Sequence, residues 1–150
     1  MTVSQVPRVP RWMTGSDVNA VLDIDWECYE RNMEREDLLR LLTSRGTIGI
    51  CVPDDQLRVV GFCVYRLATE IEIIRMGVAS RSRRCGYGTA MLDRIKSRLQ
   101  HDRTEIVAGV EGHAVHAQLM FRSAGFIGTA IEDDIRFVFT RECDDDFVSY

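Results

Sequence analysis

Lysine is almost missing from this sequence: Lys96 is the only one, and arginine supplies the rest of the positive charge. We interpret this bias as a property of composition rather than of function. No hydrophobic run approaches the roughly 20 residues that a membrane-spanning helix needs, and the first residues lack the apolar segment of a signal peptide. We therefore expect a cytoplasmic protein with no membrane partner.

Patterns that would indicate a metal site or a disulfide framework are also missing. The five cysteines are odd in number and irregularly spaced, which is typical of a protein in a reducing compartment. His113 and His116 lie three residues apart, but no third ligand is evident, so we expect no metal. The net charge of −4 argues against general nucleic-acid binding and is compatible with a cationic substrate.

The remaining composition, 45% hydrophobic and 28% charged, is typical of a folded domain. We expect one domain over residues 1–141 and an acidic tail over 142–150, and leave open whether two copies form a homodimer. Apolar periodicity predicts strands near 9–13 and at 47–52, 58–67, 70–78, 105–110, 126–131 and 135–141, and helices after Thr14, at 34–45, after Thr89 and at 114–124. This order predicts an α+β (mixed α/β) fold, with a mostly antiparallel sheet of about six or seven strands flanked by about four helices.

The most informative stretch is residues 70–99, whose pattern indicates a strand, a basic turn and an amphipathic helix. Arginines crowd the turn around Gly86 and Gly88, where the helix that follows presents unpaired N–H groups and the positive end of its dipole. Such a turn binds an anion, and glycine lets the backbone approach a polyphosphate closely. We predict a phosphate-binding site here.

The glycine spacing excludes two nucleotide-binding motifs. A P-loop requires a Gly-Lys pair, which the chain lacks, and a dinucleotide-binding turn would have a third glycine at Met91. The spacing that fits is Arg-x-x-Gly-x-Gly, from Arg83 to Gly88, between a hydrophobic strand and a helix. Together with Gly125 and Phe126 at the end of a second helix, it resembles the GNAT superfamily of N-acetyltransferases, which use acetyl-coenzyme A (acetyl-CoA). The resemblance spans nearly the whole chain.

The resemblance implies a GNAT-like fold, acetyl-CoA as cofactor, and acetyl transfer to a primary amine by direct attack in a ternary complex. The amine would belong to a protein N-terminus, a lysine or a small molecule. Backbone N–H groups of the turn would bind the pyrophosphate, the Val78 backbone would pair with the pantetheine arm, and the Met76 N–H would be an oxyanion donor. The residues implied to contact the cofactor are Met76, Val78, Arg83, Arg84, Cys85, Gly86, Tyr87, Gly88, Thr89 and Phe121.

Glu72 is the predicted general base, because its strand is similar to the one that carries the catalytic glutamate in the histone-lysine branch of this superfamily. Two-residue alternation places Glu72 on the same face as Met76, so we expect it to be partly buried; Glu70, further away, is the lesser alternative. About 13 Å of strand separates Glu72 from Met76, so a bulge or a water relay is required. The competing interpretation is a solvated carboxylate at a strand end.

The amine is expected to bind between the Trp26–Met33 region and the last hairpin. Trp26 and Tyr29 are predicted on one face of the first helix, together with Val18 and Leu22. Acidic residues on both sides would attract a cation, and they are Glu27, Glu30, Asp133 and Asp134.

No general acid is evident, since Phe121 stands where many relatives have tyrosine. A thiol with a pKa of about 8.5 leaves tolerably without one. The missing tyrosine keeps a second function open, a catalytically idle acyl-CoA-binding sensor or interaction module. A third is a nucleotide-binding protein of unrelated fold.

Overall fold

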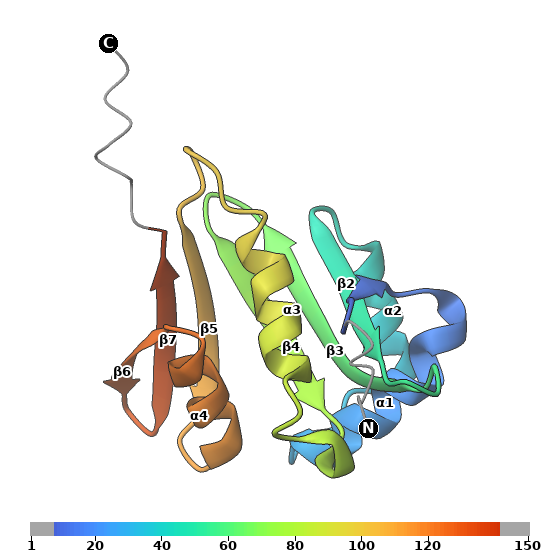
Figure 1. Cartoon of the computed structure of the whole chain (residues 1–150). Coiled ribbons are helices and arrows are strands. Elements are labelled where there is room, and N and C mark those ends of the chain that lie inside the picture. Colours follow the sequence, from blue (N-terminus) through green and yellow to red (C-terminus); the bar gives the residue numbers. More distant parts are fainter. Residues whose placement is uncertain (1–7, 142–150) are drawn as a thin grey trace, which may run out of the picture.

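The computed structural model describes residues 8–141, which form a seven-stranded sheet with helices on both faces (Figure 1). The strand order is β1-β2-β3-β4-β5-β7-β6, and only the β4–β5 pair is parallel. The strands are β1 (Arg11–Trp12), β2 (Thr47–Pro53), β3 (Val59–Leu67), β4 (Ile71–Val78), β5 (Glu105–Glu111), β6 (Ile127–Ile131) and β7 (Asp134–Thr140). The predicted mixed α/β fold with a mostly antiparallel sheet is confirmed. The predicted acidic tail lies outside the described residues.

In the described part of the chain four α-helices cover this sheet: α1 (Val18–Cys28), α2 (Arg35–Thr43), α3 (Tyr87–Lys96) and α4 (Val115–Ser123). Glycines in the strands show which helix lies on which face, because Gly77 contacts α1, Gly49 contacts α2, and Gly61, which faces the other way, contacts α3. Within residues 8–141, no helix is both long and apolar enough to cross a membrane.

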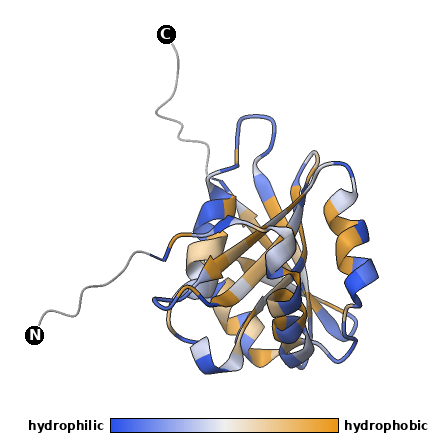
Figure 2. Cartoon of the chain, turned by 90° about the vertical axis from the view of Figure 1, so that its right-hand side faces the viewer, coloured by the Kyte–Doolittle hydropathy of each residue, from blue (hydrophilic) through white to orange (hydrophobic). Residues whose placement is uncertain are grey.

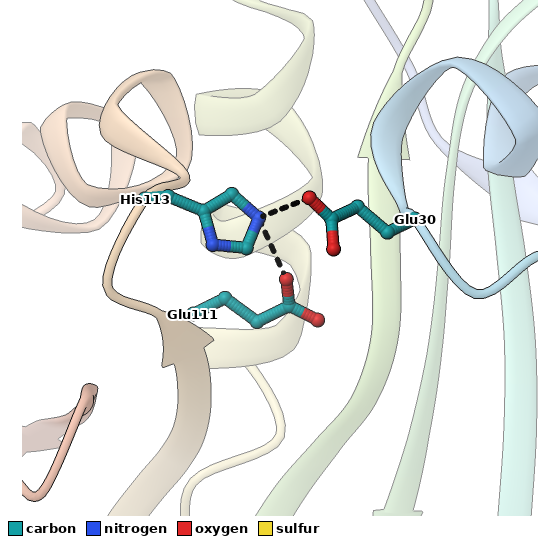
Figure 3. Close-up of side chains that lie close together, drawn as sticks. All are labelled: Glu30, Glu111 and His113. Atoms are coloured by element: carbon teal, nitrogen blue, oxygen red, sulfur yellow. Dashed lines mark ion pairs between the residues drawn. The ribbon is translucent and has the colours of Figure 1, made fainter.

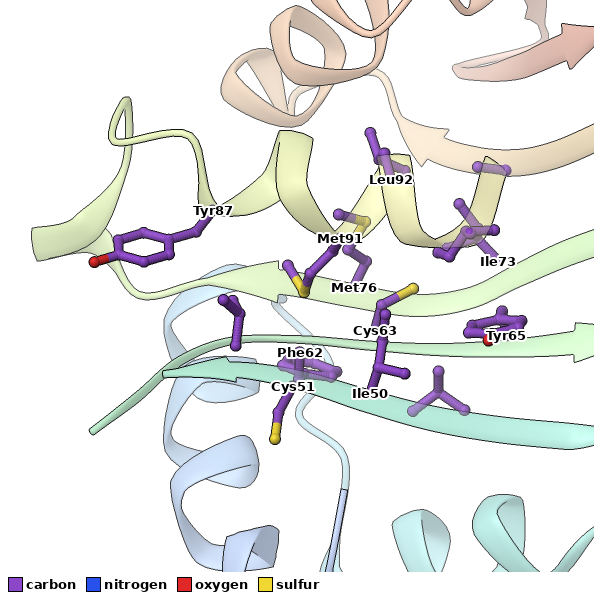
Figure 4. Close-up of a cluster of buried hydrophobic side chains, with 14 of the residues drawn as sticks. Ile50, Cys51, Phe62, Cys63, Tyr65, Ile73, Met76, Tyr87, Met91 and Leu92 are labelled. Atoms are coloured by element: carbon purple, nitrogen blue, oxygen red, sulfur yellow. The ribbon is translucent and has the colours of Figure 1, made fainter. Parts of the chain in front are cut away.

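The hydrophobic core lies between these layers, as the colouring in Figure 2 shows. On the α3 side, Met91 and Leu92 are fully buried and lie against strand residues such as Ile50, Cys63 and Met76 (Figure 4). Burying a side chain of this size contributes about 1.5–3 kcal/mol, so the apolar stripe of α3 is fixed firmly to the sheet. The N-terminus of α3 is thereby held at the end of β4.

The inner face of α1 differs from the predicted one. Trp26 is 71% exposed, whereas Val21 and Ile24 are buried and Asp25 has no exposed surface. The predicted face holds for Val18, which is buried, and for Leu22, which packs against the core, but it is wrong for Trp26. The sequence gives no sign of this because the buried carboxylate of Asp25 requires a partner, and that partner, Arg75, lies 50 residues further along the chain. The helix is therefore rotated to direct Asp25, rather than Trp26, toward the sheet.

A β-bulge in β4 determines the shape of the site. Val64 pairs with Arg75 and Tyr65 with Ile73, which leaves Ile74 as the extra residue. An extra residue inverts the alternation of side chains on either side of it and bends the strand. β4 pairs with β5 only at Ile71–Ile73, and beyond the bulge the two strands diverge (Figure 1).

Candidate active site

The opening between the diverging strands is a pocket of about 520 Å³. Its walls come from β4, β5, the turn before α3, the start of α3, one side of α4 along its length, and the end of α1. All of the residues implied to contact the cofactor line this pocket except Cys85, whose side chain is exposed. The pocket extends along β4, which lines it with every residue from Ile73 to Val78.

One end of the pocket is the turn that the sequence predicts to bind an anion. α3 begins after Gly86, and its first hydrogen bond runs from the Ala90 N–H to the Gly86 carbonyl (3.0 Å), so the N–H groups of residues 86–89 precede the helical ladder. Gly86 has a φ of +88°, which glycine adopts without strain. A Cβ at Gly88 would overlap the Met120 sulfur, so α3 and α4 approach closely at this turn. The predicted strand–turn–helix is present, with Arg83 and Arg84 beside it.

The other end of the pocket centres on the backbone of Met76. The Met76 N–H donates to the Tyr29 hydroxyl oxygen (3.1 Å), and the hydroxyl donates to the Met76 carbonyl (2.8 Å). In an antiparallel strand the N–H and C=O of one residue point to the same side. Both groups of Met76 therefore face away from β3 and toward the opening, where they hydrogen-bond to Tyr29. From the sequence, Tyr29 has no assigned catalytic role.

A buried ion pair holds Tyr29 in place. The Arg75 guanidinium lies 3.7 Å from the centre of the Tyr29 ring and donates to Asp25 at 2.6 and 3.1 Å. The same carboxylate accepts the Met33 N–H (2.7 Å), and Arg75 also donates to the Arg31 carbonyl. The loop between α1 and α2 is thus tied to β4 from both of its ends.

Three titratable side chains meet beside this loop (Figure 3). His113 Nε2 lies 2.9 Å from Glu111 Oε2 and 3.6 Å from Glu30 Oε1. Glu111 ends β5 and lines the pocket, and Glu30 directly follows Tyr29, so the cluster lies at the Met76 end. From the sequence, Glu30 was expected only to attract a cation, and His113 was considered only as a metal ligand and rejected. Glu111 has no signal in the sequence beyond its place at a strand end.

Glu72 lies elsewhere. The bulge at Ile74 turns it to the face opposite Met76, where it is an exposed side chain (53%) paired with Arg66 at 3.6 Å. Glu72 lines a separate, shallower hollow with Glu70, Val107 and Arg136. The expected partial burial and shared face with Met76 are therefore wrong, because the required bulge rotates the side chain away instead of bringing it closer. Its role as the base stays a prediction.

The α4 side of the pocket supplies no hydroxyl from a tyrosine. Phe121 is buried and packs against Phe126 and Phe137, with ring centres 5.1 and 5.4 Å apart. His116 also lines the pocket, and burial, followed by the nearby Arg83 guanidinium, lowers its pKa, so the imidazole is neutral at neutral pH.

The last hairpin does not reach this pocket: among the described residues that line it, none belongs to β6 or β7. Glu27 instead accepts the Ser80 N–H at 2.7 Å, which fixes the turn ahead of α3 to the end of α1. Of the acidic residues expected near the amine, Glu30 reaches the Glu111–His113 pair through its side chain, and Asp134 is paired with Glu111 across β5 and β7 without lining the pocket itself.

Comparison with known proteins identifies the family. The family model described as "Acetyltransferase (GNAT) family" matches residues 18–126, so the chain belongs to the GNAT acetyltransferases. A comparison with curated proteins found no match.

Solved structures share the fold at low sequence identity. The ribosomal-protein-S18-alanine N-acetyltransferase from Escherichia coli has a TM-score of 0.75 at 12% identity, covering 96% of this chain and 100% of that one. NAA60 from Arabidopsis thaliana in complex with acetyl-CoA has a TM-score of 0.74 at 13% identity, covering 90% and 100%. Spermidine N-acetyltransferase from Vibrio cholerae in complex with CoA and spermine has a TM-score of 0.69 at 14% identity, covering 88% and 94%.

Proposed function

We propose that this chain binds acetyl-CoA in the opening between β4 and β5 and transfers the acetyl group to a primary amine. The observation that carries the proposal is the divergence of the two strands, which leaves the polar backbone of Met76 facing a pocket that has an anion-binding turn at its other end. An elongated ligand with a diphosphate at one end and a thioester further along fits this arrangement.

Different groups of residues bind different parts of the cofactor. The N–H groups at the start of α3 bind the diphosphate, and Arg83 and Arg84 neutralise its charge. The open backbone edge of β4 at Val78 pairs with the amide-bearing arm of the cofactor, as an added strand would. Bound acetyl-CoA supplies the activated acyl group, and the Met76 N–H polarises its carbonyl.

The acceptor is a primary amine on a protein N-terminus, a lysine or a small molecule such as a polyamine. An ammonium group must lose a proton before it attacks. Glu111, which lies beside His113 at the Met76 end of the pocket, accepts that proton in this proposal, and Glu30 adds negative charge that attracts the cation. Glu72 is kept as the rival base.

Initial rates of thiol release from acetyl-CoA test this function. We expect turnover with at least one member of a panel that contains N-terminal peptides, lysine peptides and polyamines. Binding of CoA without turnover on any acceptor would instead support the idle sensor or interaction module.

A negative charge introduced at the start of α3 tests whether the diphosphate binds there. In Thr89→Asp, a carboxylate stands at the third helical position, where it stabilises the helix through its dipole but repels a diphosphate; CoA affinity should fall about 10-fold. Thr89→Asn is the matched neutral control, and calorimetric titration with CoA measures both. Equal affinity in the two variants would place the diphosphate elsewhere.

A further inference from the structure

We propose that Tyr29 is a catalytic residue of the transfer, whose hydroxyl is the second hydrogen-bond donor to the oxyanion that forms from the thioester. The proposal rests on the function proposed above. It starts from the unusual position of this hydroxyl, which hydrogen-bonds to both backbone groups of Met76 in the opening of the sheet.

The hydroxyl stands where a thioester carbonyl oxygen would accept the Met76 N–H. It accepts that N–H at 3.1 Å, so a bound carbonyl and the Tyr29 oxygen compete for one donor. The hydroxyl proton, by contrast, points to the Met76 carbonyl at 2.8 Å, a neutral acceptor. An oxyanion is a much better acceptor, because a charge-assisted hydrogen bond is about twice as strong as a neutral one. When the thioester carbonyl takes the place of the hydroxyl at the Met76 N–H, the hydroxyl proton can turn from the Met76 carbonyl to the thioester oxygen.

Tyr29 is held where it can do this. Arg75 lies over its ring at 3.7 Å, and Arg75 is in turn fixed by the fully buried carboxylate of Asp25. A cation over the ring strengthens the hydroxyl as a donor. Burial raises the pKa of the Tyr29 hydroxyl, so it stays protonated at neutral pH and keeps a proton to donate. The restraint by Arg75 keeps the displaced hydroxyl within reach of the same oxygen.

The step balances without a further reactant. The neutral amine forms a C–N bond to the carbonyl carbon, and the C=O electron pair moves to oxygen, where the Met76 N–H and the Tyr29 O–H stabilise it. The electron pair on oxygen then re-forms the C=O bond as the C–S bond breaks with its electron pair on sulfur. The base holds the proton that the ammonium lost before attack; nitrogen loses a second proton to solvent after attack, and the thiolate takes one from solvent, which gives the amide and CoA.

Tyr29→Phe removes only the hydroxyl. We expect kcat to fall about 30-fold with little change in the KM for acetyl-CoA, because the lost bond is much stronger to the oxyanion of the transition state than to the neutral carbonyl of the bound thioester. Tyr65→Phe is the matched control, since Tyr65 is a buried core residue outside the pocket. Unfolding in urea reports whether either change disturbs the fold.

A spectroscopic readout separates contact from structural support. The infrared carbonyl stretch of bound, ¹³C-labelled acetyl-CoA should lie at higher wavenumber in Tyr29→Phe than in the wild type, because one hydrogen bond to the oxygen is lost. An unchanged kcat overturns the proposal, and so does a lower kcat with an unchanged stretch, which would make Tyr29 a positioning residue. If the wild type binds acetyl-CoA but never turns over, the acetyltransferase function fails while the stretch still decides the contact.

Discussion

Replacing Glu111 by glutamine should lower kcat about 1,000-fold, because an amide cannot accept the proton that the attacking ammonium must lose. Glu111 lines the pocket at the end of β5, and its Oε2 lies 2.9 Å from His113 Nε2. Glutamine preserves the size of the side chain, so cofactor binding should change little. Thiol-release kinetics with a saturating amine give kcat, and titration with CoA gives the affinity.

Glu72→Gln is the matched control, since it removes a carboxylate from the same sheet on the opposite face of β4. We expect its kcat to stay within about twofold of the wild type, because Glu72 lies outside the pocket and on the face of β4 opposite Met76. The reverse outcome, a large loss in Glu72→Gln and none in Glu111→Gln, would return the base to Glu72 and require a water relay around the bulge.

Arg75→Ala should lower the free energy of unfolding by about 3–5 kcal/mol, the cost of leaving a buried charge without its partner. Asp25 has no exposed side-chain surface, and Arg75 is 21% exposed. Loss of Arg75 also frees the Arg31 carbonyl and uncovers the Tyr29 ring. Urea denaturation at neutral pH measures the change, provided that the slope of the transition stays constant.

Arg66→Ala is the control for a surface pair, because Arg66 and Glu72 are 40% and 53% exposed and 3.6 Å apart. It should cost no more than about 1 kcal/mol. The double variant Asp25→Leu with Arg75→Met should recover most of the loss in Arg75→Ala, since an apolar pair leaves no charge buried. A loss in Arg75→Ala no larger than that in Arg66→Ala would show that the buried pair does not hold the loop.

The fold could be predicted because its signals are local. Alternating apolar residues in 47–52 and 58–67 indicate a hairpin, and the glycine-bearing turn before α3 indicates an anion site. These patterns depend only on near neighbours in the chain, and the structure has the strands and the strand–turn–helix where they were expected.

The site could not be predicted to the same extent, because it depends on partners far apart in sequence. Nothing around Ile74 marks it as a bulge, yet that one residue decides which face Glu72 occupies. Asp25 and Arg75 are 50 residues apart, and Tyr29 reaches Met76 across 47. One signal could have been used: Arg75 stands between the apolar residues Ile74 and Met76 inside a strand, and such an arginine indicates a buried acidic partner.

The most direct measurement is a calorimetric titration of acetyl-CoA into the wild-type chain, with ATP and NAD titrated in parallel. We expect one acetyl-CoA per chain, with a dissociation constant between about 1 μM and 1 mM, as is usual for enzyme substrates, and no heat from ATP or NAD. Binding of ATP or NAD in the absence of any acetyl-CoA binding would contradict the assignment of the β4–β5 opening as a coenzyme A site.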